Sequence, residues 1–165
     1  STLDNLKDAF AGESQANRKY LAFAKKADQD GFKQVAKLFR AAAEAETIHA
    51  HAHLRVMGGI KSTAENLQVA VEGEGYEYQS MYPKFLEEAK AEGNAAASKT
   101  FEFALAAEKV HHDLYVKALA SVKAGKDEPE ATIYLCPVCG NLEIGTAPDA
   151  CPICGVKKDR FIPIS

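Results

Sequence analysis

Tryptophan is absent from this chain of 165 residues, and cysteine is absent from its first 135. All four cysteines lie in the last 30 residues, as two close pairs. A secreted disulfide scaffold usually distributes its cysteines along the chain, whereas close pairs at one end are typical of metal ligands. The cysteine pattern therefore argues against a disulfide framework and predicts a metal site near the C-terminus.

A charge excess and a long apolar run are also missing. Lys and Arg number 20 and Asp and Glu 23, a formal net charge of −3, so nothing predicts binding to nucleic acid. No apolar run is long enough to span a bilayer, and the first residues lack the basic-then-apolar pattern of a secretion signal. We therefore expect a cytoplasmic protein that binds neither nucleic acid nor membranes.

Proline and glycine are scarce before residue 125, where Pro83 is the only proline. Apolar residues recur there at helical spacing in four stretches. Short breaks at Asp30-Gly31 and Gly93-Asn94 separate the first stretch from the second and the third from the fourth, which predicts antiparallel neighbours. We predict an all-α four-helix bundle, in which Pro83 removes a hydrogen bond from the third helix and kinks it.

The composition changes after Ala124. A polar stretch containing Gly125 and Pro129 is typical of a linker. A short strand pattern begins at Thr132 and is followed by a tail rich in Gly, Pro and Cys. We predict a helical bundle over residues 1–124, a linker over 125–131 and a small β-rich metal module over 132–165.

Each apolar helix face carries glutamate, a residue that is costly to bury unpaired. The second and fourth helices repeat one element, Glu-x-x-His, whose members lie one turn apart on one side of a helix. One Glu from each of two helices, with Glu-x-x-His from each of the other two, is the ligand set of di-iron carboxylate bundles. The candidate ligands are Glu13, Glu46, His49, Glu74, Glu108 and His111, with Glu77 as an additional carboxylate one turn beyond Glu74.

Any single glutamate of this kind is more often an edge residue with its head group in water. An edge position does not explain the whole set, because glutamates lie at matching positions on all four helices. The separation in sequence between Glu46 and Glu108 also equals that between His49 and His111. Carboxylates with two imidazoles suit iron or manganese. His51 is expected in solvent and His53 at the edge of the core, and the Glu-x-x-His register favours His111 over its neighbour His112 as a ligand.

Two tyrosines, Tyr20 and Tyr82, follow Glu13 and Glu74 by about two helical turns. Packing in the core and a hydrogen bond from the phenol to a ligand carboxylate are equally compatible with that spacing.

The cysteines form two matching knuckles, Cys136-Pro-Val-Cys139-Gly and Cys151-Pro-Ile-Cys154-Gly. Four thiolates can close a tetrahedron around zinc or iron. Tyr134 and Phe161 could shield an iron centre from water or form the small core of a zinc knuckle.

The motifs of this chain are AGES at 11–14, AETIH at 45–49, GEGYE at 73–77, AEKVH at 107–111 and the two CPxCG knuckles. With these motifs in this order, the chain resembles the rubrerythrins over essentially its whole length. Such proteins join a ferritin-like di-iron bundle to a rubredoxin module.

The resemblance implies that Glu46 and Glu108 bridge two irons. It implies that Glu13 is a terminal ligand of the first iron, and that Glu74 and His111 bind the second.

Reduction of the first iron is expected to exchange Glu77 for His49. Cys136, Cys139, Cys151 and Cys154 would hold the FeS4 iron, or zinc in recombinant protein.

The activity implied by the resemblance is reduction of hydrogen peroxide to water in oxidative-stress defence, with electrons relayed from NAD(P)H by a reductase or a rubredoxin. We expect Glu77, His49, Tyr20 and Tyr82 to take part in catalysis. A homodimer or larger homo-oligomer is expected, with the rubredoxin of one subunit near the di-iron centre of another. The alternatives are a ferritin-like ferroxidase and a non-enzymatic electron carrier or zinc-knuckle module.

Overall fold

The computed structural model describes all 165 residues. The chain forms two compact units, Ser1–Lys61 and Ser62–Ser165. None of its helices has the length and apolar character needed to cross a bilayer.

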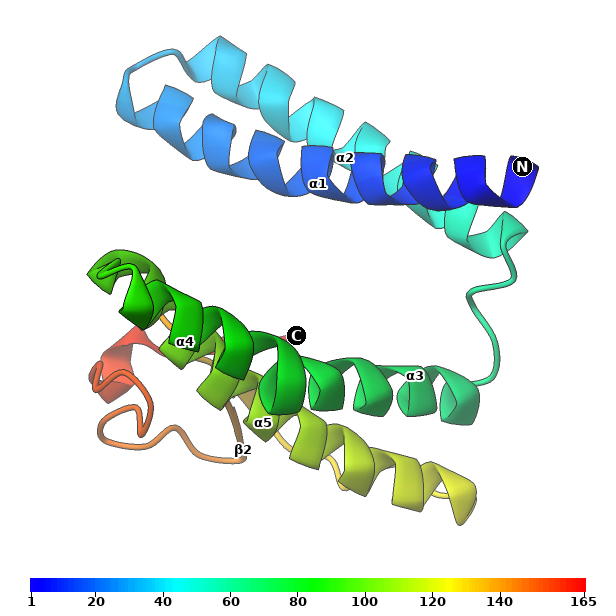
Figure 1. Cartoon of the computed structure of the whole chain (residues 1–165), viewed down its shortest axis with the longest axis vertical. Coiled ribbons are helices and arrows are strands. Elements are labelled where there is room, and N and C mark those ends of the chain that lie inside the picture. The colour runs from blue at the N-terminus through cyan, green and yellow to red at the C-terminus, as the bar shows by residue number, and fades with distance from the viewer. The chain divides into compact units, whose positions relative to one another are not determined.

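The first unit is an antiparallel hairpin of α1 (Thr2–Gln29) and α2 (Lys33–Val56), drawn in blue to cyan in Figure 1. Ser1 caps α1 in a capping box with Asp4, and Gly31, with φ of 87°, lies in the turn between the helices. Buried alanines occupy the contact between the two helices. They are Ala24, Ala27, Ala36, Ala43 and Ala50.

The second unit begins with α3 (Thr63–Tyr76), a π-helix η1 (Glu77–Met81) and α4 (Tyr82–Ala91), which pack against α5 (Ala95–Lys123). A capping box of Ser62 with Glu65 starts α3. The third helix expected from the sequence is thus not continuous, because η1 interrupts it just before Pro83.

The Cys-rich end of the second unit is a small antiparallel sheet in the order β2-β1-β3. Its strands are β1 (Ile133–Leu135), β2 (Leu142–Ile144) and β3 (Ile162–Ile164), and a 3-10 turn η2 (Lys158–Arg160) precedes the last. Phe161 is buried with Cys136, Cys139 and Cys151, and Tyr134 packs against this cluster. The aromatic residues therefore cover the cysteine site.

The predicted boundaries near residues 124 and 132 coincide with element ends, since α5 ends at Lys123 and β1 begins at Ile133. The division into compact units falls elsewhere, after Lys61. The three-part organisation of residues 1–124, 125–131 and 132–165 stays a prediction.

Candidate metal centres

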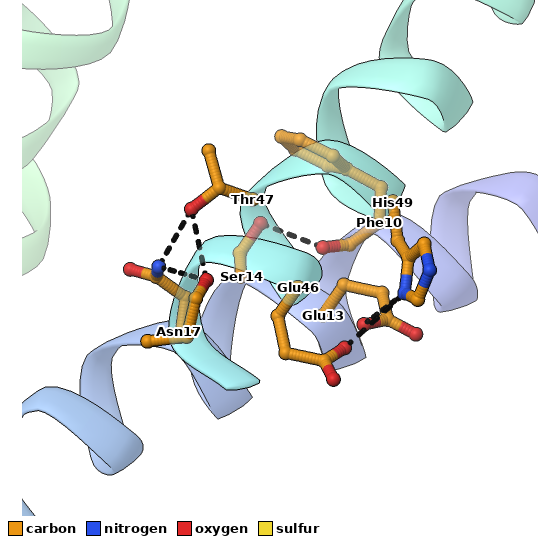
Figure 2. A network of polar contacts seen from close by, with 8 residues as sticks. Phe10, Glu13, Ser14, Asn17, Glu46, Thr47 and His49 are labelled. Atoms are coloured by element: carbon orange, nitrogen blue, oxygen red, sulfur yellow. Dashed lines mark hydrogen bonds and ion pairs between the residues drawn. The ribbon is translucent and has the colours of Figure 1, made fainter. Parts of the chain in front are cut away.

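Three candidate ligands meet in the α1–α2 hairpin, and we call them the α1–α2 half-site: Glu13 from α1 with Glu46 and His49 from α2. The His49 Nδ1 atom lies 3.5 Å from Glu13 Oε2 and 3.5 Å from Glu46 Oε2, as Figure 2 shows. Glu46 and His49 share a helix face one turn apart, and the antiparallel packing brings Glu13 opposite them.

A buried polar network sets the register of this half-site. Asn17 on α1 is only 7% exposed, and its Nδ2 donates hydrogen bonds to Ala43 O at 2.8 Å and Thr47 Oγ1 at 2.7 Å on α2 (Figure 2). Arg18 Nε in turn donates to Asn17 Oδ1 at 2.8 Å. Because Asn17 follows Glu13 by one turn and Thr47 is next to Glu46, these bonds hold the two carboxylates at one level.

The second unit repeats the arrangement in the α3–α5 half-site, formed by Glu74, Glu108 and His111. The His111 Nδ1 atom lies 3.6 Å from Glu74 Oε1 and 3.8 Å from Glu108 Oε2. Burial raises the pKa of Glu108, and the neighbouring His111 partly opposes that shift.

Both half-sites fit a metal ion. The Oε2 atoms of Glu13 and Glu74 are buried and accept no hydrogen bond. A buried carboxylate oxygen without a donor is costly, and a bound cation would compensate it. In each half-site the candidate ligand atoms lie within 4.8 Å of one another, and two carboxylates with one imidazole suit iron or manganese.

Glu77 is half-buried at the start of η1 and is not part of the α3–α5 half-site. Its charge, together with the larger effect of burial, raises the pKa of Tyr82. The structure thus brings His49 to the carboxylates of its half-site and leaves Glu77 apart from those of its own unit.

The two tyrosines pack against aromatic rings. Tyr20 contacts Phe23 and Phe39, with ring centroids 6.4 and 6.0 Å away. Tyr82 contacts Phe101 at 6.0 Å and Phe85 at 6.4 Å. Neither phenol makes a hydrogen bond within the chain, so core packing is the role that these contacts support, while a catalytic role stays a prediction.

The four cysteine sulfurs converge on one point. Cys136 Sγ lies 3.5 Å from Cys154 Sγ, and Cys139 Sγ lies 3.6 Å from Cys151 Sγ. Tetrahedral bonds of about 2.3 Å to one metal ion place sulfurs about 3.8 Å apart, close to this spacing. The cysteines therefore fit a four-thiolate site.

The two knuckles turn in the same way. Gly140 and Gly155 have φ of 84° and 81°, which favours glycine, and their amides donate to Cys136 O and Cys151 O. Burial acts to raise the pKa of Cys136, but hydrogen bonds from the backbone of Cys139 and Val138 outweigh it and lower the value to about 7. Burial raises the pKa of Cys139.

One hydrogen bond joins the cysteine module to the α3–α5 half-site. His111 Nε2 lies 2.7 Å from the carbonyl oxygen of Gly140, the residue after Cys139. A carbonyl can only accept, so Nε2 carries the proton and the Nδ1 lone pair of the neutral ring points toward Glu74 and Glu108. The module thereby orients the ring of His111, a candidate metal ligand.

Comparison with known proteins agrees with this geometry. The family model described as Rubrerythrin matches residues 4–119, and the rubredoxin-like domain of rubrerythrin matches residues 134–162. The chain belongs to the rubrerythrin family. Its fold class is confirmed as a helical ferritin-like bundle with a small rubredoxin-like module.

Individual rubrerythrin relatives align with nearly the whole chain. Rubrerythrin-2 of Clostridium acetobutylicum is 38% identical over 97% of this chain and 95% of its own. Nigerythrin of Nitratidesulfovibrio vulgaris is 39% identical over 98% of this chain and 85% of its own. The structure of fully reduced, all-ferrous nigerythrin is similar with a TM-score of 0.60, at 38% identity, covering 99% of this chain and 87% of that one.

Membership in the rubrerythrin family implies a di-iron site in the helical part, and the four cysteines fit an FeS4 centre. The cofactors expected from the sequence are therefore confirmed as classes, while the ligand assigned to each position stays a prediction.

Sequence reasoning missed Asn17, Thr47 and the Gly140 carbonyl. A polar residue one turn beyond Glu13 on the apolar stripe could have pointed to Asn17. The carbonyl of Gly140 has no sequence signal, because every residue carries one.

Proposed function

We propose that this rubrerythrin-family protein is a non-haem di-iron peroxidase that reduces hydrogen peroxide to water. Its own rubredoxin-like centre would re-reduce it, with electrons that come ultimately from NAD(P)H through a reductase or a separate rubredoxin. We further propose that it acts in the cytoplasm, in defence against oxidative stress.

The observation that carries this proposal is the 2.7 Å hydrogen bond between His111 Nε2 and Gly140 O. It completes a path from the Cys139 sulfur, along the backbone of Cys139 and Gly140, to a candidate ligand of the di-iron site. Because a peroxidase must be reset by two electrons after each turnover, a built-in donor suits it. An iron-storage ferroxidase passes electrons to oxygen and needs no such donor.

The α1–α2 and α3–α5 half-sites together supply four carboxylates and two imidazoles, the ligand set of a di-iron bundle. We propose that Glu46 and Glu108 bridge the irons, with Glu13 and Glu74 as terminal ligands and His111 on the second iron. Two ferrous ions held there would supply the two electrons that cleavage of the O–O bond consumes.

Reduction of one peroxide to two waters also consumes two protons. A tyrosine phenol is protonated at neutral pH, and burial with the Glu77 charge raises the pKa of Tyr82 further, so the phenol can donate a proton or a hydrogen bond. We propose Tyr20 and Tyr82 as the nearby phenols, with the carboxylates as the second source of protons.

We also propose that Glu77 and His49 exchange at the first iron as its oxidation state changes. Replacing Glu77→Ala removes the carboxylate from this exchange, whereas Glu87→Ala changes an exposed glutamate of α4 as a matched control. We expect peroxide turnover to fall in Glu77→Ala alone, measured as NADH consumption in a coupled assay. Unchanged turnover in both variants contradicts the exchange.

The experiment that tests the proposed function is rapid mixing of anaerobically reduced, iron-loaded protein with equal hydrogen peroxide or oxygen. The visible absorbance of both iron centres is followed. We expect both centres to oxidise, and to do so much faster with peroxide. If oxygen is as fast, or if the FeS4 centre stays reduced while the di-iron site oxidises, an oxidase or ferroxidase is the better description.

Zinc in the four-cysteine site provides the matched control, because zinc keeps the tetrahedron and carries no electron. We expect this protein to oxidise its di-iron site once with peroxide and then to stop. Continued turnover at the normal rate would mean that electrons reach the di-iron site by another path.

A further inference from the structure

His112 follows the candidate ligand His111 on α5 and is not itself part of the α3–α5 half-site. Its side chain is only 20% exposed, and its Nδ1 atom lies 3.3 Å from a carboxylate oxygen of the exposed Asp113. Successive residues of an α-helix point in directions about 100° apart, so His112 does not point where His111 points. Its ring instead contacts α3 and η1.

The contact with α3 is made at Gly75, a buried residue next to Glu74. A Cβ atom at residue 75 would lie 3.3 Å from His112 Cδ2 and 3.5 Å from His112 Nε2. Gly73, on the other side of Glu74, has no neighbouring atom within 4 Å of the corresponding position. Glycine inside a helix is unfavourable relative to alanine. The close approach of the His112 ring is therefore a physical reason for Gly75 that Gly73 lacks.

The contact with η1 is made at Tyr78, the second residue of that π-helix. The ring centroids of Tyr78 and His112 are 5.2 Å apart and the ring planes are inclined by 60°, a geometry typical of aromatic pairs. Tyr78 is half-buried and directly follows Glu77. His112 therefore joins the position beside Glu74 on α3 to the position beside Glu77 on η1.

The π-helix η1 determines where Glu77 lies. Residues three apart share a face in a regular α-helix, yet Glu74 belongs to the α3–α5 half-site and Glu77 does not. The π-turn starts at Glu77, and such turns are rare and frequent at functional sites. The separation of Glu77 from Glu74 therefore depends on this turn. Because η1 packs against α5, the helix that carries His112, the turn is held by side chains of that helix.

We propose that His112 is a positioning residue. By packing against Gly75 and Tyr78 it holds η1 in place and keeps Glu77 out of the α3–α5 half-site. This deepens the proposed function, because the proposed movement of Glu77 at the first iron then requires the contact of His112 with Tyr78 to give way. It rests on Glu77 being a metal ligand and does not depend on the substrate.

Cobalt in the helical metal site reports whether Glu77 binds. The full-length chain is prepared with zinc in the four-cysteine site, and Co²⁺ is then added to the helical part. The visible absorption of Co²⁺ weakens as its coordination number rises, so one additional carboxylate ligand can be detected. We expect His112→Ala to release Glu77 toward the metal and to lower the absorption per bound cobalt by about half. An unchanged spectrum overturns the proposal.

A double variant identifies the additional ligand. If that ligand is Glu77, Glu77→Gln combined with His112→Ala restores the absorption of the unmodified cobalt protein, and Glu77→Gln alone leaves it unchanged. A loss of absorption that persists in the double variant overturns the proposal, because the cobalt has then changed its ligands without Glu77.

Further substitutions separate the packing of the ring from a general loss of stability. His112→Phe keeps a ring against Gly75 and Tyr78 and should retain the unmodified cobalt spectrum. Gly75→Ala places a methyl group against the ring and should change the spectrum as His112→Ala does. Gly73→Ala is the matched control, since it also adjoins Glu74 but has open space, and should leave the spectrum unchanged. Equal spectra of the two glycine variants overturn the proposal.

Hydrogen exchange of the backbone amides tests the role of His112 without any metal ion. We expect the amides of residues 77–81 to exchange about tenfold faster in His112→Ala than in the unmodified protein, while those of α1 keep their rates. Equal rates in η1 overturn the proposal. If the helical part binds neither cobalt nor iron, the proposed function fails, and this measurement alone then decides whether His112 holds η1 in place.

Discussion

At the scale of the residue, Asn17 shows how a polar group can position a metal site without binding metal. It is the buried polar side chain of the α1–α2 hairpin. Its amide donates to both a backbone carbonyl and the Thr47 hydroxyl on the opposite helix. Because buried alanines alone would allow the helices to slide, these directional bonds define how Glu13 faces Glu46 and His49.

Replacing Asn17→Ala should therefore lower the free energy of unfolding by about 1–3 kcal/mol, the usual effect of leaving buried partners unsatisfied. The measurement is urea unfolding of the metal-free protein, followed by circular dichroism. Gln15→Ala, an exposed residue of the same helix, is the matched control and should change the free energy by less than about 0.5 kcal/mol. Equal effects of the two substitutions contradict the role of Asn17.

Tyr82 gives a pH dependence with a definite sign. Burial and the Glu77 charge raise its pKa above the usual 10.0, so the folded protein holds the proton more tightly than the unfolded chain. Its contribution to the free energy of unfolding is complete below pH 10 and is lost as the pH rises through the folded pKa.

In an alkaline titration of tyrosinate absorbance, Glu77→Gln should shift the ionisation of Tyr82 toward lower pH, because one of its two causes is removed. Tyr82→Phe identifies which step of the titration belongs to this residue. A titration curve that is the same with and without the Glu77 charge would contradict the assigned cause.

At the scale of the element, η1 explains how the third helix accommodates Pro83. A proline inside a regular helix lacks a donor and its ring clashes with a carbonyl of the preceding turn. The π-helix Glu77–Met81 ends directly before α4, and Pro83 lies in the first turn of that helix, where proline is tolerated. The sequence indicated an interruption here, but not its type, because π-helices have no simple residue signature.

Replacing Pro83→Ala should therefore change the free energy of unfolding by less than about 1 kcal/mol, well below the roughly 3 kcal/mol of a proline in a helix interior. Lys117→Pro, at an exposed position inside α5, should show that full loss. Thermal unfolding of both variants measures the difference. A large gain in stability from Pro83→Ala would mean that the proline strains the helix despite η1.

At the scale of the whole molecule, iron is expected to stabilise the helical part. The buried Oε2 atoms of Glu13 and Glu74 accept no hydrogen bond within the chain, and a cation that binds only the folded state adds to its stability. The FeS4 module has its own ligands and its own small core.

Removal of the di-iron metal by a chelator, with the FeS4 centre retained, should lower the unfolding temperature of the helices. Calorimetry with far-ultraviolet circular dichroism measures this, while the visible absorbance reports the module. A variant with Cys136→Ser and Cys139→Ser is the control and should destabilise the module. If the helices unfold at the same temperature with and without iron, iron does not stabilise them and the buried carboxylates of Glu13 and Glu74 do not need a cation.

Much of the fold follows from local pattern. The helix ends at Asp30-Gly31 and Gly93-Asn94 are close to where the sequence indicated them, because helix caps depend on neighbouring residues. The candidate ligands could also be identified, since an i, i+3 pair shares a helix face in any α-helix. The sequence could not decide whether Tyr20 and Tyr82 pack in the core or bind a ligand carboxylate, because both roles are compatible with the same spacing along the helix.

The sequence by itself determined which residues are candidate metal ligands and how they are grouped along the chain, because Glu-x-x-His and Cys-x-x-Cys act within one or two turns of backbone. Only the tertiary structure decided that Asn17 ties Glu13 to Glu46 and that the Gly140 carbonyl orients His111. These contacts join segments 26 to 30 residues apart in sequence, and they depend on how helices and module pack rather than on any local pattern.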